Sequence, residues 1–86
     1  MNEGNEQNRL AVVAIIVEAA AAAPRVNEVL HGMRDHIAGR MGLPYRERGI
    51  SVISVVMDAP AAAINALSGR LGMIDGVHAK VLFSNR

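Results

Sequence analysis

Three arginines, three glycines and one tyrosine share a short segment of the chain, which reads GRMGLPYRERG and covers residues 39–49. The guanidinium group of arginine holds carboxylates and phosphates through paired hydrogen bonds, and glycine lets backbone N–H groups approach an anion closely. A small anionic ligand is therefore a reasonable occupant of this segment. The candidate residues, for such a site or for a contact between subunits, are Gly39, Arg40, Gly42, Tyr45, Arg46, Glu47, Arg48 and Gly49.

A structural role explains the same segment, and we favour it over a ligand site. Gly49 permits a turn, Pro44 stiffens it, and Glu47 can pair with a neighbouring arginine, either in its own chain or across a subunit contact. Arginines at a subunit contact can also hold a ligand there. Both interpretations of the segment therefore stay open.

Catalysis is the weakest interpretation of the sequence. The chain contains no G-x-S-x-G elbow, HExxH pair, P-loop or GxGxxG motif. Ser51 and Ser54 alternate with aliphatic residues as in an ordinary strand, and Asp58 stands where it could cap a helix. We therefore predict no catalytic residue and no enzyme, unless an active site forms between subunits.

The three histidines do not predict a metal site. His31 falls in a predicted helix and His36 at the start of a predicted strand, so their spacing fixes no ligand pair, and His78 lies far along the chain. The sequence has no cysteine, which removes the thiolate ligands of many zinc and nickel sites. We expect three solvent-facing histidines and no metal, and the sequence points to no particular cofactor.

The length and composition predict one small cytoplasmic domain. The chain has 86 residues, a formal net charge of +1, and only Tyr45 and Phe83 as aromatic residues, which disfavours direct binding of nucleic acid. The apolar run from Leu10 to Val17 is too short to span a membrane, and the acidic residues around it do not suit a secretory signal. We predict a flexible polar tail over residues 1–8 and a single domain over residues 9–86, with no membrane association.

The order of elements follows from hydrophobic periodicity. Apolar, largely β-branched runs predict strong strands over residues 10–17 and 50–57, and weaker patterns predict strands over 36–42 and 77–84. Helical spacing of apolar residues predicts helices over residues 24–33 and 60–72. With right-handed crossovers, this order gives the α+β ferredoxin-like βαββαβ sandwich: a four-stranded antiparallel sheet, order 4-1-3-2, with two helices on one face.

The two central strands are apolar on both faces, although helices can cover only one face of such a sheet. The uncovered face should then join copies of the chain, because contiguous apolar patches normally mark an interface. The spacing does not decide which face meets the helices. We assign the intersubunit face to Val13, Ile15, Val17, Ile53, Val55 and Met57.

Four segments resemble the family of iron-only hydrogenase system regulators: VVAIIVE, VNEVLH, GRMGLPYRERGISVISVVMDA and INALSGRLGMIDGVHAKVLFS. The resemblance covers Leu10 to about Ser84 and is most specific in GRMGLPYRERGIS. It implies a ferredoxin-like fold related to ACT domains and to the ligand-binding half of nickel-responsive regulators, and it implies an oligomer. It implies no particular ligand.

These observations predict an oligomeric, ACT-like regulatory module, a dimer or tetramer, that binds a small ligand or a protein partner. It would lack a DNA-binding domain of its own, since eight residues before Arg9 are too few for one. Two alternatives remain: a purely structural assembly protein, and an enzyme whose active site is completed by a second subunit.

Overall fold

The computed structural model describes residues 7–86. Residues 1–6 of the predicted tail lie outside the described residues. Strand β1 begins at Asn8, which pairs with Pro60. The elements are β1 Asn8–Val17, α1 Ala23–His31, β2 Ile37–Tyr45, β3 Ile50–Pro60, α2 Ala61–Gly72 and β4 Val77–Phe83, with short 3-10 helices at Ala20–Ala22, Arg34–His36 and Arg46–Arg48.

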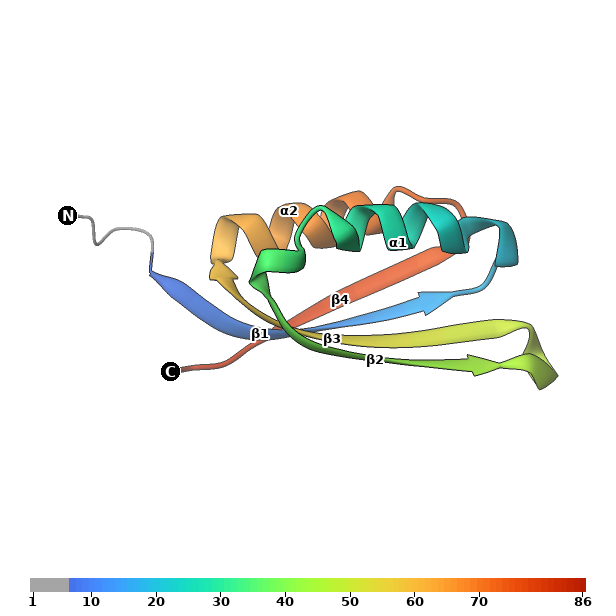
Figure 1. Ribbon diagram of the computed structural model, residues 1–86, viewed down its shortest axis with the longest axis horizontal. Helices are drawn as coiled ribbons and strands as arrows, with labels where there is room; N and C mark the ends of the chain where they lie inside the picture. Colours follow the sequence, from blue (N-terminus) through green and yellow to red (C-terminus); the bar gives the residue numbers. More distant parts are fainter. Residues whose placement is uncertain (1–6) are drawn as a thin grey trace.

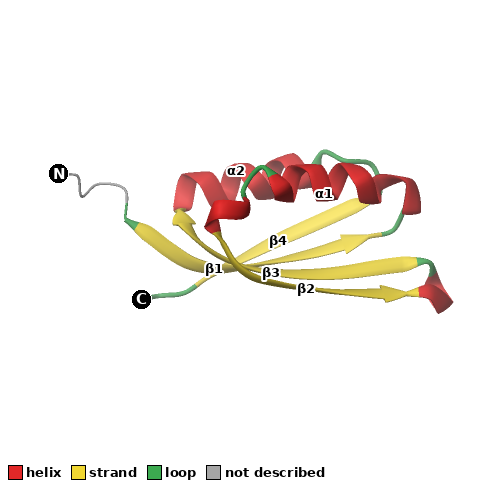
Figure 2. Ribbon diagram, in the orientation of Figure 1, coloured by secondary structure: helices red, strands yellow, loops and turns green. Residues whose placement is uncertain are grey.

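The strands form one antiparallel sheet in the order β2-β3-β1-β4. Both helices lie on the same face of this sheet, and no element of residues 7–86 covers the opposite face (Figures 1 and 2). This arrangement confirms the predicted ferredoxin-like sandwich, in which the two apolar strands β1 and β3 occupy the centre. We call the uncovered side the open face.

Each helix contributes one apolar stripe to the core. Helix α1 has Pro24 in its first turn, where proline is well tolerated, and buries Val26, Val29 and Leu30. Helix α2 buries Ile64, Leu67 and Leu71. The spacing of three and four residues places each set on one side of its helix, and both stripes meet the sheet.

The predicted capping role of Asp58 is wrong. The residue before α2 is Pro60, which makes no side-chain cap, and Asp58 lies within β3 opposite Leu10 of β1. Strand β3 extends beyond the predicted end because β1 also starts early and gives the last residues of β3 a pairing partner.

The predicted intersubunit residues lie in the core, so that assignment is wrong. Val13, Ile15, Val17, Ile53, Val55 and Met57 are all buried on the face of the sheet that the two helices cover. Successive strand residues point to opposite faces, so the set that faces outward is the alternate one. It includes Leu10, Val12, Ile16, Val52 and Val56, which are exposed or half-buried.

Strand β2 ends three residues later than the predicted strand over residues 36–42. It runs to Tyr45, and an irregularity in its pairing with β3 lies between Ile37 and Gly39. The 3-10 helix Arg46–Arg48 and Gly49 then connect it to β3, so that the two strands form a hairpin whose tip lies at one end of the molecule (Figure 1).

Candidate functional site

The hairpin divides the predicted ligand residues between the two faces of the sheet. Arg40 and Gly42 lie opposite the buried residues Val55 and Ile53, and therefore face the helices. Gly39 and Tyr45 have the alternate register, opposite Val56 and Ile50, and belong to the open face. The segment is thus not a single cluster, because an extended strand cannot direct neighbouring side chains to the same side.

The tip of the hairpin carries the remaining predicted residues. Arg46, Glu47 and Arg48 form an exposed 3-10 turn, and Gly49 follows with φ 65, a left-handed conformation that favours glycine. The N–H of Gly49 donates a hydrogen bond to the carbonyl oxygen of Arg46 at 3.1 Å. Within residues 7–86, no arginine lies within 4.0 Å of the Glu47 carboxylate, which leaves only a contact with another chain for the predicted pair.

Arg40 is fixed by a contact with α1. Its Nη2 atom donates a hydrogen bond to Oδ1 of Asn27 at 3.1 Å. Sequence reasoning missed Asn27, because nothing in the spacing of α1 marks one exposed polar residue as the partner of a strand arginine. The contact places the guanidinium group between β2 and α1, beside a cavity that Gly42 also lines.

The open face carries all the exposed large hydrophobic side chains of residues 7–86 except Met73. Its exposed large hydrophobic side chains are Leu10, Val12, Met41, Leu43, Tyr45, Val52 and Leu82. The expectation that the sheet is apolar on both faces is therefore confirmed. Leu82 and Met41, on the two edge strands, are each 73% exposed, and Leu43 is 58% exposed.

Pairing registers show how the open face is arranged. Ala14 lies opposite Ser54 of β3 on one side and opposite Lys80 of β4 on the other. The rows on either side of this one contain Val12 with Val56, and Ile16 with Val52. Ala14 and Ser54 therefore form a small step at the centre of this row, whose outer positions are Met41 on β2 and Lys80 on β4.

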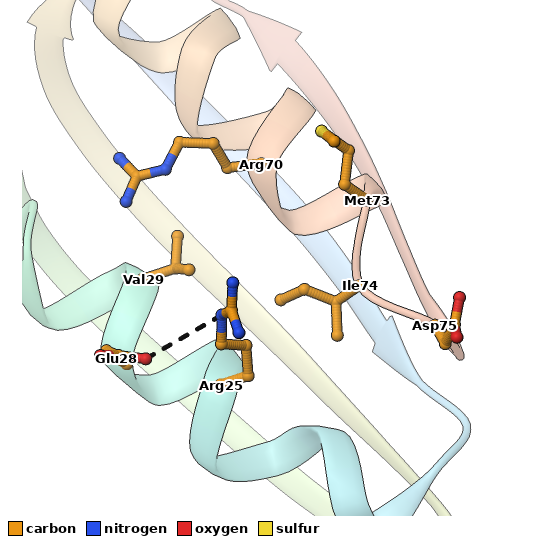
Figure 3. Close-up of a pocket in the computed structure, with 7 residues that line it drawn as sticks. All are labelled: Arg25, Glu28, Val29, Arg70, Met73, Ile74 and Asp75. Atoms are coloured by element: carbon orange, nitrogen blue, oxygen red, sulfur yellow. Dashed lines mark ion pairs between the residues drawn. The ribbon is translucent and has the colours of Figure 1, made fainter.

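A groove on the outer side of the helices is a second candidate surface. It has a volume of about 770 Å³ and lies between α1 and α2 (Figure 3). Its lining residues are Arg25, Glu28, Val29, Arg70, Met73, Ile74 and Asp75. The two basic residues are matched by two acidic ones, and the Nε atom of Arg25 lies 4.0 Å from Oε1 of Glu28. The groove is wide, and its charges favour no particular ligand.

The histidines are dispersed. Nε2 of His78 lies 2.8 Å from Oε1 of Glu18, and both side chains are exposed, whereas His31 and His36 are at the end of α1 and in the following turn. The part of the chain that the structure describes contains no group of three or more histidine, cysteine or acidic residues able to hold a metal ion. No helix in residues 7–86 combines the length and the apolar character needed to cross a membrane.

Comparison with known protein families shows which family this chain is related to. Residues 9–81 match the TM1266-like family, described as Iron-only hydrogenase system regulator, a role that the description marks as proposed. The chain belongs to this family. The match covers all four strands as far as Val81 and both helices, so the relationship extends over the whole domain. A comparison with curated proteins finds no match.

Two solved structures place this regulator-family member among known folds. The uncharacterized protein TM1266 from Thermotoga maritima is 36% identical, with a TM-score of 0.86 over 90% of this chain and 98% of that chain. A formyltetrahydrofolate deformylase from Pseudomonas putida KT2440 is 17% identical, with a TM-score of 0.66. That likeness covers 90% of this chain but only 29% of the deformylase, and it shows a shared fold alone.

Proposed function

We propose that this chain is a non-catalytic regulatory module that works as a homo-oligomer and binds a small ligand or a protein partner. The observation that carries the proposal is the apolar open face. Membership of a family described as regulators of iron-only hydrogenase systems supports the regulatory part. The open face supports the oligomeric part, because a patch of this kind would otherwise remain in contact with water.

The free energy gained by burying the open face is large for a domain of this size. Burying one large aliphatic side chain contributes about 1.5–3 kcal/mol, and a small domain is typically stable by only about 5–15 kcal/mol. Several such side chains occupy the open face together, among them Val12, Val52 and Leu82. These side chains are already partly buried in the sheet, so covering the whole face would add a gross stabilisation comparable to the stability of the isolated domain.

A second copy of the chain is the occupant that the face fits best. Its centre, formed by β1 and β3, carries aliphatic and small side chains between Asp58 at one end and Glu18 at the other, and Lys80 and His78 lie on the edge strand β4. These polar groups border the apolar centre at both ends and along β4, while Met41 and Leu43 extend it onto β2. A polar rim around an apolar centre is typical of protein interfaces. Two such sheets can pack face to face about 10 Å apart, giving four layers with helices outside.

The open face also has a hollow and projecting side chains that could fit those of a second copy. A hollow of about 280 Å³ lies between β1, β3 and β4, and its lining includes Val12, Val56 and Leu82. The protruding side chains of Met41 and Leu43 lie on the opposite edge strand. A hollow at one edge and projecting side chains at the other suit an interface between identical surfaces.

The regulatory step that we propose is a shift of the assembly equilibrium. A ligand that binds one assembly state more tightly stabilises that state by its differential affinity. The hairpin is a suitable origin for this coupling, because Tyr45 lies on the open face while Arg40 and Gly42 face the helices on the same strand. A ligand held by the helix side of β2 would act on the strand that also borders the interface.

Two thermal measurements test the proposal. In a homo-oligomer, the melting temperature rises with protein concentration, because dissociation accompanies unfolding. A screen with carboxylates, nucleotides and divalent metals should then raise the melting temperature with one class of compound. A melting temperature independent of protein concentration would refute the oligomer, whereas an oligomer that responds to no compound would be a purely structural assembly protein.

A further inference from the structure

The space between α1 and the β2–β3 hairpin is not filled by side chains of β2. Beyond Ile37, which packs against the core at the start of β2, the residues of this strand that face the helices are Arg40, Gly42 and Pro44, and none of these three has a large aliphatic side chain. A Cβ atom built on Gly42 would have no atom within 4 Å. By contrast, β4 places Val81 and Phe83 against the core on the other side of the sheet. The asymmetry leaves a cavity of about 240 Å³ beneath α1.

The walls of this cavity are apolar and its polar groups are few. Ala23, Pro44 and Ile53 contribute aliphatic surface from α1, β2 and β3, and the buried Val17 and Val26 lie behind them. Polar side chains enter the lining at Asn27, Arg40 and Ser51. Apolar walls with a small number of placed polar groups are typical of sites for small molecules, and this volume is below the ~300–1,000 Å³ of sites for larger ligands. The cavity therefore suits a compact ligand.

Arg40 is the group that would orient such a ligand. Its contact with Asn27 holds the guanidinium group at the cavity, and uses one of five N–H donors. The remaining donors can form the paired hydrogen bonds that a carboxylate accepts. A neighbouring hollow of about 350 Å³ also includes Asn27 and Arg40, together with His31 and Arg34, so the surroundings of Arg40 are basic.

The lining also indicates what the ligand lacks. Among residues 7–86, no aspartate or glutamate lines either the cavity or the neighbouring hollow. An ammonium group brought into the cavity would lose water without gaining a carboxylate partner, which is unfavourable. A simple carboxylic acid fits this lining better than an amino acid does.

We propose that this cavity binds a small monocarboxylate with a compact branched aliphatic body. The aliphatic body lies against Ala23, Pro44 and Ile53, and the carboxylate accepts hydrogen bonds from Arg40. This inference names the class of ligand that the proposed regulatory module binds, and it rests on the proposed function only because that function requires a ligand. The ligand site does not depend on the open face, so the ligand proposal and the oligomer proposal can fail separately.

Titration with 3-methylbutanoate, followed by the backbone amide resonances of the full chain, tests the proposal. Saturable shifts are expected at Asn27, Gly42 and Ser51 below about 10 mM. Arg40→Met keeps the aliphatic stem and removes the charge, and it should weaken binding at least tenfold, roughly the value of a charge-assisted hydrogen bond. Gly42→Val should fill the cavity and abolish binding, and the space around Gly42 together with the strand preference of valine favours correct folding.

Matched controls make the result decisive. Arg46→Met removes an arginine at the hairpin tip, outside the cavity, and should leave the dissociation constant within about twofold. The uncharged amide of 3-methylbutanoate and the amino acid leucine should bind at least tenfold more weakly than the acid. The proposal is overturned if 3-methylbutanoate causes no saturable shift, if leucine binds equally well, or if the folded Arg40 and Gly42 variants bind like the wild type. If one variant fails to fold, the other decides.

Discussion

Val12 and Val13 are neighbours in β1, yet Val13 is fully buried beneath the helices while Val12 is 37% exposed on the open face. Their partners on β3 repeat the pattern, since Val13 lies opposite the buried Val55 and Val12 opposite Val56 of the open face. The central strands therefore have an apolar residue on each side at the same level. One side forms the core, and the other is available to a second copy.

Substituting these two valines should have different consequences. Val13→Ala should lower the free energy of unfolding by about 2 kcal/mol, because it removes buried methyl groups and leaves a cavity. It should not change the dissociation constant of the oligomer. Val12→Ala should weaken the oligomer and cost little in the dissociated chain. Urea unfolding and dilution experiments measure the two quantities, and equal effects of both substitutions on unfolding alone would contradict our assignment of the faces.

A charge in the middle of the open face should prevent association. Val52→Lys places an ammonium group on each copy of a two-fold interface, and burying both without partners should raise the dissociation constant at least about 100-fold. The control is Met73→Lys, since Met73 is 85% exposed and follows α2 on the helical side. Light scattering after size-exclusion chromatography should show a smaller species for the first variant only. An unchanged mass for both would place the interface elsewhere.

Two glycines with positive φ should differ in their tolerance of alanine. Gly76 has φ 81, and a Cβ atom there would lie 2.7 Å from the Cβ of Ala19. Gly49 has φ 65 and open space around it. We expect Gly49→Ala to cost only the left-handed conformation, about 1 kcal/mol, and Gly76→Ala to cost clearly more because the loop must also move. Thermal melting of the two variants gives the order, and the reverse order would contradict the geometry.

Removing the two arginines at the hairpin tip should leave the fold unchanged. Arg46 and Arg48 are exposed in a short turn, and exposed substitutions usually change stability by less than about 0.5 kcal/mol. The double variant Arg46→Ala with Arg48→Ala should therefore melt like the wild type. If the variant stays folded but its mass in solution is lower than that of the wild type, the tip belongs to a subunit contact. A large loss of melting temperature in the dissociated chain would instead show a structural role that the described contacts do not contain.

The fold could be predicted because its signals are local. One face of α1 is marked by Val26, Val29 and Leu30, and a central strand by the β-branched run from Leu10 to Val17. Both patterns agree with the ferredoxin-like topology. Which side of the central strands meets the helices could not be predicted. Val12 and Val13 are the same residue type, so hydrophobicity alone cannot distinguish the covered side from the uncovered one.

The candidate site could be predicted only in part. The sequence identified Arg40 and Gly42, but it grouped them with Tyr45, which the pairing of β2 places on the other face. That grouping failed because residues 43–45, which lie beyond the predicted strand, continue β2, and strand alternation separates neighbours. Asn27 could not be found at all, because its contact with Arg40 is set by how α1 lies over the sheet and not by the local pattern of the helix.

Sedimentation velocity at about 1 μM chain concentration tests the central claim most directly, since specific homodimers commonly persist at this dilution. We predict a species of at least twice the 9.1 kDa mass of the chain, and its loss in the Val52→Lys variant. A folded species of 9.1 kDa at this and at tenfold higher concentration would mean that the open face stays in water, and would contradict the account.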